Sequence, residues 1–159
     1  MNIVKQIARE QYRALVNKTA EQIHDRQCPN EGWISMVRNA LGMSAAQLAR
    51  RLGVTRNHIS KTEKAELSGA VTIKTMQNMA EGMGCRFFYA IIPERTVEEI
   101  VTSRARKKAT QIVEITSKHM ALEGQSLSDK QIAIEIKRIQ KMLLEDMPPD
   151  FWNDEFPHD

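Results

Sequence analysis

The sequence has few of the residues that cross-link a fold or bind metal ions, and it has no long apolar run. Only two cysteines, Cys28 and Cys85, occur in 159 residues. Two isolated cysteines make neither a disulfide framework nor a zinc site. No apolar stretch approaches the roughly 18–20 residues that a membrane span requires. The first residues contain acids and no small-residue cleavage site, so we expect no signal peptide and a reduced, cytoplasmic protein.

Patterns that carry catalysis are also absent. The four histidines are scattered, no glycine-rich phosphate loop occurs, and no nucleophile lies beside a base. His24 and Cys28 are one helical turn apart, but two ligands do not make a metal site. We therefore expect no enzyme, no cofactor and no metal.

Charge is distributed unevenly along the chain. The net charge is only +3, but residues 145–159 hold six acids and no lysine or arginine. The preceding residues carry 23 basic against 14 acidic groups. A basic body with an acidic tail is typical of a nucleic-acid binder with a separate protein contact. The alternative is a solvated surface with a frayed end.

Apolar spacing predicts a mainly α fold. The helices are expected over residues 2–25, 33–41, 45–52, 56–64, 72 to about 82, 96 to about 122, and from 129 onwards. The expected N-caps are Ser44, Thr55, Thr72 and Ser128. Inward positions are expected at Trp33, Ile34, Val37 and Leu41, and on a first-helix stripe of Ile3, Ile7, Tyr12, Leu15, Val16, Ala20 and Ile23.

In one segment the apolar residues no longer follow helical spacing. CRFFYAII, residues 85–92, is β-branched and aromatic between Gly84 and Pro93, which predicts a β-strand. One strand cannot satisfy its own backbone groups. We therefore expect it to pair with the same strand of a second copy, giving a homodimer through Cys85–Ile92. The alternative is a partner within the chain, around residues 70–72.

These patterns predict the domain organisation. The expected regions are an N-terminal helix at 1–30, a helix-turn-helix domain at 31–84, a dimerisation strand at 85–93, a helical partner-binding extension at 94–146, and an acidic aromatic tail at 147–159. The tail carries Phe151, Trp152 and Phe156 among acids, which suggests a docking segment. A disordered end is the alternative.

Residues 44–64, SAAQLARRLGVTRNHISKTEK, meet the packing demands of a helix-turn-helix motif. Ala49 allows the two helices to approach closely, and Gly53 supplies the left-handed turn. The positions expected to face inward are apolar, namely Leu48, Leu52, Val54 and Ile59. The second helix is then the one that reads DNA.

Polar side chains on this motif suit DNA contacts. Arg56 can pair with guanine and Asn57 with adenine, and Lys61 can reach a base or a phosphate. The sugar-phosphate backbone of the DNA is expected to be contacted by Ser44, Thr55, Arg50, Arg51 and Arg38. His58 and Ser60 complete the predicted set of DNA contacts. The alternative is a helical bundle whose motif no longer binds DNA.

The segment GMSAAQLARRLGVTRNHISKTEK resembles the helix-turn-helix of Cro/repressor-type (XRE) regulators. Together with GWISMVRNA before it and IKTMQNMAEGMGCRFFYAIIP after it, the chain resembles the mobile mystery protein A family over about residues 10–125. Members of that family are typically paired with a Fic-domain protein. The resemblance therefore implies an autorepressing antitoxin.

HMALEGQ, residues 119–125, is similar to the Fic-inhibitory motif. In that motif a glutamate pairs with an arginine of the Fic active site and displaces the γ-phosphate of ATP. Glu123 and Gly124 match the motif, whereas His119 stands where the motif has Ser or Thr. The alternative is a helix end with Leu122 in the core and Gly124 as the C-cap.

Three functions follow from these patterns. The leading interpretation is a DNA-binding repressor and antitoxin whose partners are operator DNA and a Fic-domain toxin. The second is a protein-only inhibitor with a helix-turn-helix that does not read DNA. The third is a stand-alone regulator with a small-molecule inducer.

Overall fold

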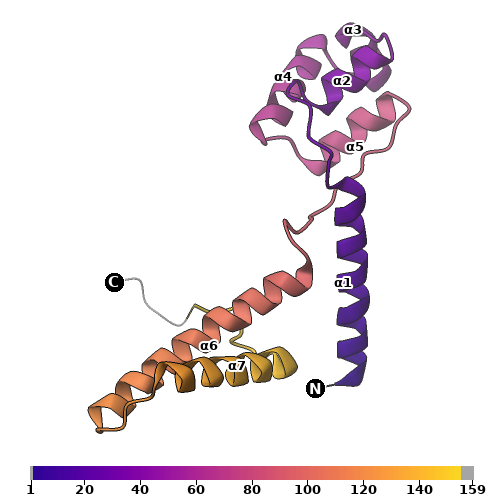
Figure 1. The fold of residues 1–159 in the computed structure, drawn as a ribbon. Coiled ribbons are helices and arrows are strands. Elements are labelled where there is room, and N and C mark those ends of the chain that lie inside the picture. The colour runs from indigo at the N-terminus through magenta and orange to yellow at the C-terminus, as the bar shows by residue number, and fades with distance from the viewer. Residues whose placement is uncertain (1, 155–159) are drawn as a thin grey trace. The chain divides into compact units, whose positions relative to one another are not determined.

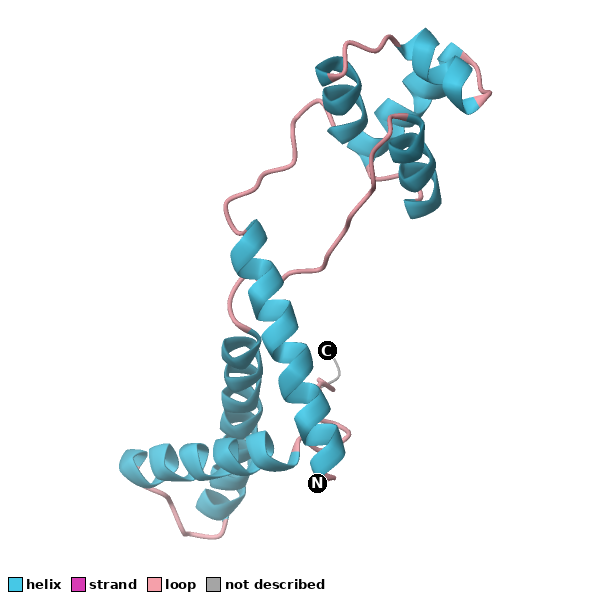
Figure 2. Cartoon of the chain, turned by 90° about the vertical axis from the view of Figure 1, so that its right-hand side faces the viewer, coloured by secondary structure: helices cyan, strands magenta, loops and turns pink. Residues whose placement is uncertain are grey.

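The computed structural model describes residues 2–154, and within them all regular secondary structure is helical (Figures 1 and 2). The helices are α1 (Ile3–Ile23), α2 (Trp33–Ala40), α3 (Ala45–Leu52), α4 (Arg56–Ser68), α5 (Ile73–Gly82), α6 (Val97–Leu122) and α7 (Asp129–Asp146). The chain divides into two compact units. One unit, Ile23–Ala90, contains α2–α5; the other contains α1, α6, α7 and the segment after α7.

The unit of α2–α5, here called the helix-turn-helix unit, is built from short helices, and the N-termini of α3, α4 and α5 are each capped by the residue that precedes the helix. The Ser44 hydroxyl accepts a hydrogen bond from the Gln47 N–H, and the Gln47 side chain accepts one from the Ser44 N–H, which completes a capping box. Thr55 and Thr72 cap α4 and α5 through their hydroxyls. The predicted N-caps, including Ser128 on α7, are confirmed.

The turn between α3 and α4 forms as the sequence predicts. Gly53 is left-handed with φ 67°, a conformation that costs glycine nothing because it has no Cβ. Leu48 and Ile59 are fully buried and Ala49 is 3% exposed, so the two helices pack closely. Their shared core also contains Ile34, the α5 residues Met76 and Met79, and Met83, the C-cap of α5.

Carboxylates on the inner face of α4 fix its position against α2. Gly32, the N-cap of α2, has no capping side chain, and the Glu66 carboxylate accepts hydrogen bonds from the Trp33 and Ile34 N–H groups at 2.6 and 3.0 Å. An anion at a helix N-terminus also interacts favourably with the helix dipole. One turn earlier, Glu63 pairs with Arg38 at 2.8 Å. These contacts orient α4 without using its outer face.

The second unit, here called the helical unit, is a hairpin of α6 and α7 to which α1 is joined. The hairpin turn begins where Gly124, at φ 78°, follows the C-cap residue Glu123. The Gln125 N–H bonds to the Met120 carbonyl and the Gly124 N–H to the Ala121 carbonyl, which is a Schellman motif. The helix ends at Leu122, with Glu123 as its C-cap and Gly124 as the left-handed residue that follows the cap. The alternative interpretation is therefore right that a helix ends here, but Leu122 is 88% exposed and not in the core.

Asn17 joins α1 to the beginning of α6. Its side-chain oxygen accepts a hydrogen bond from the Val97 N–H at 3.0 Å, and its amide donates to Glu98 at 2.7 Å. Hydrogen bonds from the backbone of Glu98 and from Asn17, with the nearby charge of Arg13, lower the pKa of the Glu98 carboxyl. This first turn of α6 is therefore stabilised by its own N-cap, Thr96, and by a neighbouring helix.

The segment after α7 is part of the core of the helical unit. Phe151 is 1% exposed and packs with Val101 and Ala105 of α6. Arg104 donates to the Phe151 and Asn153 carbonyls and to the Asp154 carboxylate, at 2.6–2.8 Å. The buried Lys108 donates to the carbonyl and carboxylate of Asp150. For Phe151 the docking interpretation is therefore wrong, whereas Phe156 lies outside the described residues.

The predicted β-strand is wrong. Residues 85–92 have no regular secondary structure, and residues 2–154 contain no strand with which they could pair, including around 70–72. A strand is stable only when its backbone groups bond to a neighbour. Within residues 85–92 only Phe87 packs against the core of its unit, and its ring stacks on that of Tyr89 with 5.9 Å between the ring centroids. Phe88 and Ile91 are 65% and 94% exposed.

Several inward predictions are also wrong. Trp33 and Leu41 are 43% and 52% exposed, because the core contact of α2 is made by Ile34 with Val37 beside it. On α1 the predicted stripe is largely exposed, at Ile3, Ile7, Tyr12 and Leu15. None of the described helices is both long and apolar enough to span a membrane.

Candidate nucleic-acid interface

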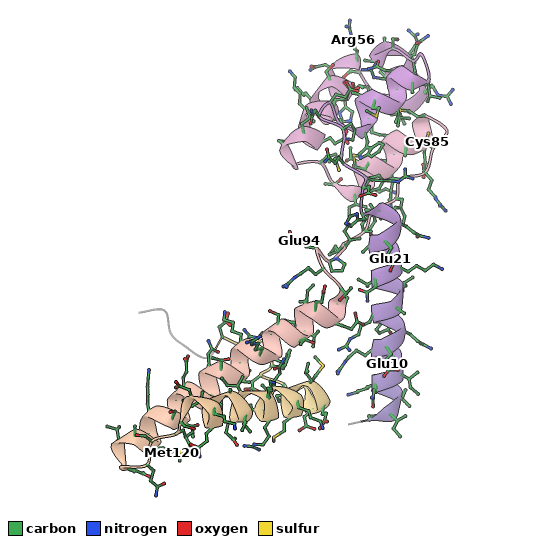
Figure 3. The ribbon with its side chains drawn as sticks, in the orientation of Figure 1. Glu10, Glu21, Arg56, Cys85, Glu94 and Met120 are labelled. Atoms are coloured by element: carbon green, nitrogen blue, oxygen red, sulfur yellow. The ribbon has the colours of Figure 1, made fainter. Side chains whose placement is uncertain are left out.

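The outer face of α4 gathers most of the predicted base-reading residues. Arg56, Asn57 and Lys61 are exposed and Ser60 is half-buried. Their spacing places them on one side of the helix, since neighbours three or four apart share a face. Figure 3 labels Arg56 at the outer surface of its unit. The opposite side of α4 carries the buried Ile59 and Thr62.

This outer face contains one basic residue that sequence reasoning missed. Lys64 is exposed and lies four residues after Ser60 and seven after Asn57, so it belongs to the same face. This spacing in the sequence is sufficient to predict that Lys64 lies on the outer face of α4. The face then presents three cations, Arg56, Lys61 and Lys64, with no carboxylate between them, because Glu63 and Glu66 point to α2.

His58 lies away from this face. It lines a hollow of about 220 Å³ between α4 and α5, together with Val54, Thr75 and Asn78. Its carbonyl accepts a hydrogen bond from the buried Thr62 hydroxyl. A contact from His58 to DNA would therefore be made at the flank of α4, separately from Arg56 and Asn57.

The two capping residues place helix N-termini at the surface. Ser44 and Thr55 are exposed, and their hydroxyl oxygens accept hydrogen bonds from Gln47 N–H at 3.2 Å and His58 N–H at 3.1 Å. Each hydroxyl still has its own proton to donate. A helix N-terminus with such a donor suits a phosphate group.

The arginines of α3 differ in their surroundings. Arg50 and Arg51 are exposed and line an open hollow of about 500 Å³ with Gln47 and the turn before α3. Arg51 also donates from Nε to the Gly82 carbonyl at 2.7 Å, which fixes its guanidinium against the end of α5. Arg38 is instead held by Glu63 and the Met43 carbonyl, with 13% of its side chain exposed. Arg38 therefore has a structural role within its unit.

The residues of the Fic-like motif lie at the tip of the α6–α7 hairpin. His119, Glu123 and Gly124 are all exposed. Within residues 2–154 the Glu123 carboxylate has no hydrogen-bond or ion-pair partner. The motif is thus presented to solvent beside the exposed Leu122.

In the described part of the chain no group of three or more His, Cys, Asp or Glu side chains could hold a metal ion.

Comparison with known proteins supports the helix-turn-helix assignment. The family model for helix-turn-helix proteins matches residues 34–89, which span α2 to α5. No curated protein and no solved structure matches the chain. Residues 34–89 therefore form a helix-turn-helix domain of the XRE type, and this domain supports a DNA-binding regulator.

Proposed function

We propose that the chain is a sequence-specific repressor that reads operator DNA with the outer face of α4. The observation that supports this most strongly is the separation of charges on α4. The carboxylates of α4 bond to α2, while Arg56, Asn57, Lys61 and Lys64 are exposed to solvent. Ser60 lies half-buried on the same face. In a major groove Arg56 would pair with guanine and Asn57 with adenine. Ser44, Thr55, Arg50 and Arg51 would contact the sugar-phosphate backbone.

A matched pair of double variants tests this proposal. Changing Arg56 and Lys61 to Ala should weaken operator binding by at least about tenfold and reduce the preference over a scrambled duplex, since each bidentate base contact contributes about 1–3 kcal/mol. Arg106 and Lys107 to Ala, which removes two exposed cations from α6, is the control. Equal losses in both variants would mean that only overall charge matters, and no loss in either would support a helix-turn-helix that does not read DNA.

We further propose that the hairpin tip inhibits a Fic-type toxin, which would make the protein an antitoxin that regulates its own operon. The support is the exposed, unpaired Glu123 on a turn fixed by Gly124, beside an exposed Leu122. A free carboxylate on a rigid tip can form a charge-assisted pair with an arginine of the partner. His119 would supply a ring nitrogen where the motif has a hydroxyl.

Glu123→Gln tests the inhibitory role. It should abolish neutralisation of AMP transfer by the protein of the neighbouring reading frame, while complex formation changes little. Glu114→Gln, also exposed on α6, is the matched control. If Glu123→Gln still neutralises AMP transfer, the inhibitory-motif interpretation is wrong. If no complex forms at all, the stand-alone regulator is favoured.

We also propose that the protein acts on its operator as a homodimer. With the strand excluded, the support is the exposed apolar side chains of residues 85–92, among them Tyr89 and Ile91. Two reading helices would then meet two half-sites about one helical turn apart. Sedimentation of Ile91→Asp against the unchanged protein tests this: the dimer should dissociate in the variant, and a monomer in both would contradict it.

A further inference from the structure

The helix-turn-helix unit contains an apolar cavity that DNA reading does not use. Its volume is about 260 Å³, and it lies between α2, α5 and residues 85–88. We call it the α2–α5 cavity. Its walls include Trp33, Val37, Met79, Met83, Phe87 and Phe88. Methionine side chains are adaptable and make favourable contacts between sulfur and aromatic rings, which suits a small apolar ligand.

The volume of the α2–α5 cavity limits the size of the ligand that it can bind. An engineered cavity of roughly 150 Å³ lined by Leu, Ile and Phe binds benzene, whereas drug-sized ligands fill about 300–1,000 Å³. A cavity of about 260 Å³ therefore fits one substituted ring or a short alkyl chain. Such a ligand would also cover Phe88, which is 65% exposed although it lines the cavity.

Arg86 gives the cavity a charge. It lines the cavity and is exposed, and within residues 2–154 it has no hydrogen-bond or ion-pair partner. Among the residues that the structure describes, no carboxylate lines the cavity. A guanidinium beside an apolar cavity favours a ligand with an apolar body and a carboxylate head, because the carboxylate can accept two parallel hydrogen bonds.

We propose that the α2–α5 cavity binds a small apolar carboxylate, either a medium-chain fatty acid or a substituted aromatic acid. The apolar part enters between α2 and α5, and the carboxylate pairs with Arg86. The cavity is thus an effector site within the DNA-binding domain itself.

Two features connect α5, which forms one wall of the cavity, to the DNA-reading surface. Met79 lines the α2–α5 cavity and also the hollow beside His58 and Val54. At the end of α5, the Gly82 carbonyl accepts the hydrogen bond from Arg51, and a Cβ added at Gly82 would lie 2.6 Å from a Leu52 methyl carbon. Packing this tight transmits small displacements. A ligand that moves α5 therefore shifts Arg51 and the start of α4, an effect that rests on the proposed DNA binding.

The binding experiment uses the tryptophan in the cavity wall. The chain has two tryptophans, Trp33 and Trp152, so the full-length Trp152→Phe protein reports from Trp33 alone. Octanoate and 3-phenylpropionate, titrated separately, distinguish the two acid classes. At least one should change Trp33 fluorescence saturably, and the corresponding alcohol should bind at least about tenfold more weakly. Non-saturable changes, or equal binding of acid and alcohol, would overturn the proposal.

Two substitutions locate the site. Arg86→Gln should remove the preference for acid over alcohol, and Arg95→Gln, an exposed arginine of the helical unit, should leave it unchanged. Cys85→Phe places a large side chain at the cavity wall and should weaken both ligands. If either cavity variant keeps a native circular dichroism spectrum and binds as before, the assignment is wrong. Concentration-dependent Trp33 changes without any effect of acid would instead identify a second copy as the occupant.

Operator binding is then measured with and without the acid. The proposal expects a changed affinity that Arg86→Gln abolishes. Saturable acid binding by a protein that binds no operator would count against the proposed function and leave the cavity site intact. Operator binding with no acid binding would overturn the cavity site alone.

Discussion

The two units of the molecule are stabilised in different ways. In the helix-turn-helix unit, helices of 8–13 residues surround one core in which Leu48 and Ile59 are fully buried. In the helical unit, the helices have 18–26 residues, and neither α1 nor α7 has a fully buried residue. Its most buried large side chain, Phe151, comes from outside the helices. The N-caps and the turn between α3 and α4 in the first unit therefore depend on neighbouring residues, whereas a segment distant in the sequence completes the core of the second unit.

The largest expected effect tests the long-range contact. Phe151→Ala should cost about 3–5 kcal/mol of unfolding free energy in the helical unit, because it leaves a cavity beside Val101 and Ala105. Hydrogen exchange along α6 would measure it. Trp152→Ala, 54% exposed, is the control and should cost about 1 kcal/mol or less. Unchanged protection of α6 in Phe151→Ala would show that the segment is not part of that core.

A similar substitution tests the helix-turn-helix unit. Leu48→Ala should cost about 2–5 kcal/mol and should also weaken operator binding, because Leu48 shares a core with Ile59 of the reading helix. Urea unfolding followed by circular dichroism, with anisotropy on operator DNA, gives both values. Leu67→Ala, 58% exposed on α4, should change neither by much. If Leu48→Ala kept full operator affinity, DNA binding by α4 would not depend on the packing of this core.

The same contrast explains what the sequence could predict. The caps Ser44 and Thr55 and the turn at Gly53 depend on neighbouring residues, and each is confirmed. The strand was wrong because its stability depends on a partner that residue types do not reveal. The contacts of Arg104 and Lys108 could not be predicted either, because these residues bond to a segment more than 40 residues away in the sequence.

Within the candidate site, the limits were similar. The periodicity of α4 was sufficient to place Arg56, Asn57 and Lys61 on one face, and it should also have identified Lys64. The periodicity could not show that Arg38 pairs with Glu63, because these two residues are 25 positions apart in the sequence and lie on different helices.

The smallest expected effect concerns the contact between α1 and α6. Asn17→Ala removes a hydrogen bond that lowers the pKa of Glu98, so the pKa of that carboxyl should rise toward its ordinary value. A folded-state pKa below the unfolded one stabilises the folded state at neutral pH. This contribution decreases as the pH falls from the ordinary glutamate range through the lowered pKa. NMR titration of Glu98 measures the shift, and an unchanged pKa in Asn17→Ala would contradict the assigned cause.

The most direct test of the central claim is fluorescence anisotropy with DNA from immediately upstream of the gene. A scrambled duplex is the comparison, at two salt concentrations. We expect a preference for the native fragment of at least about 10³-fold, the lower range for specific binding. That preference should persist at the higher salt, where phosphate contacts weaken. Equal binding to both duplexes that disappears at the higher salt would contradict base reading by α4.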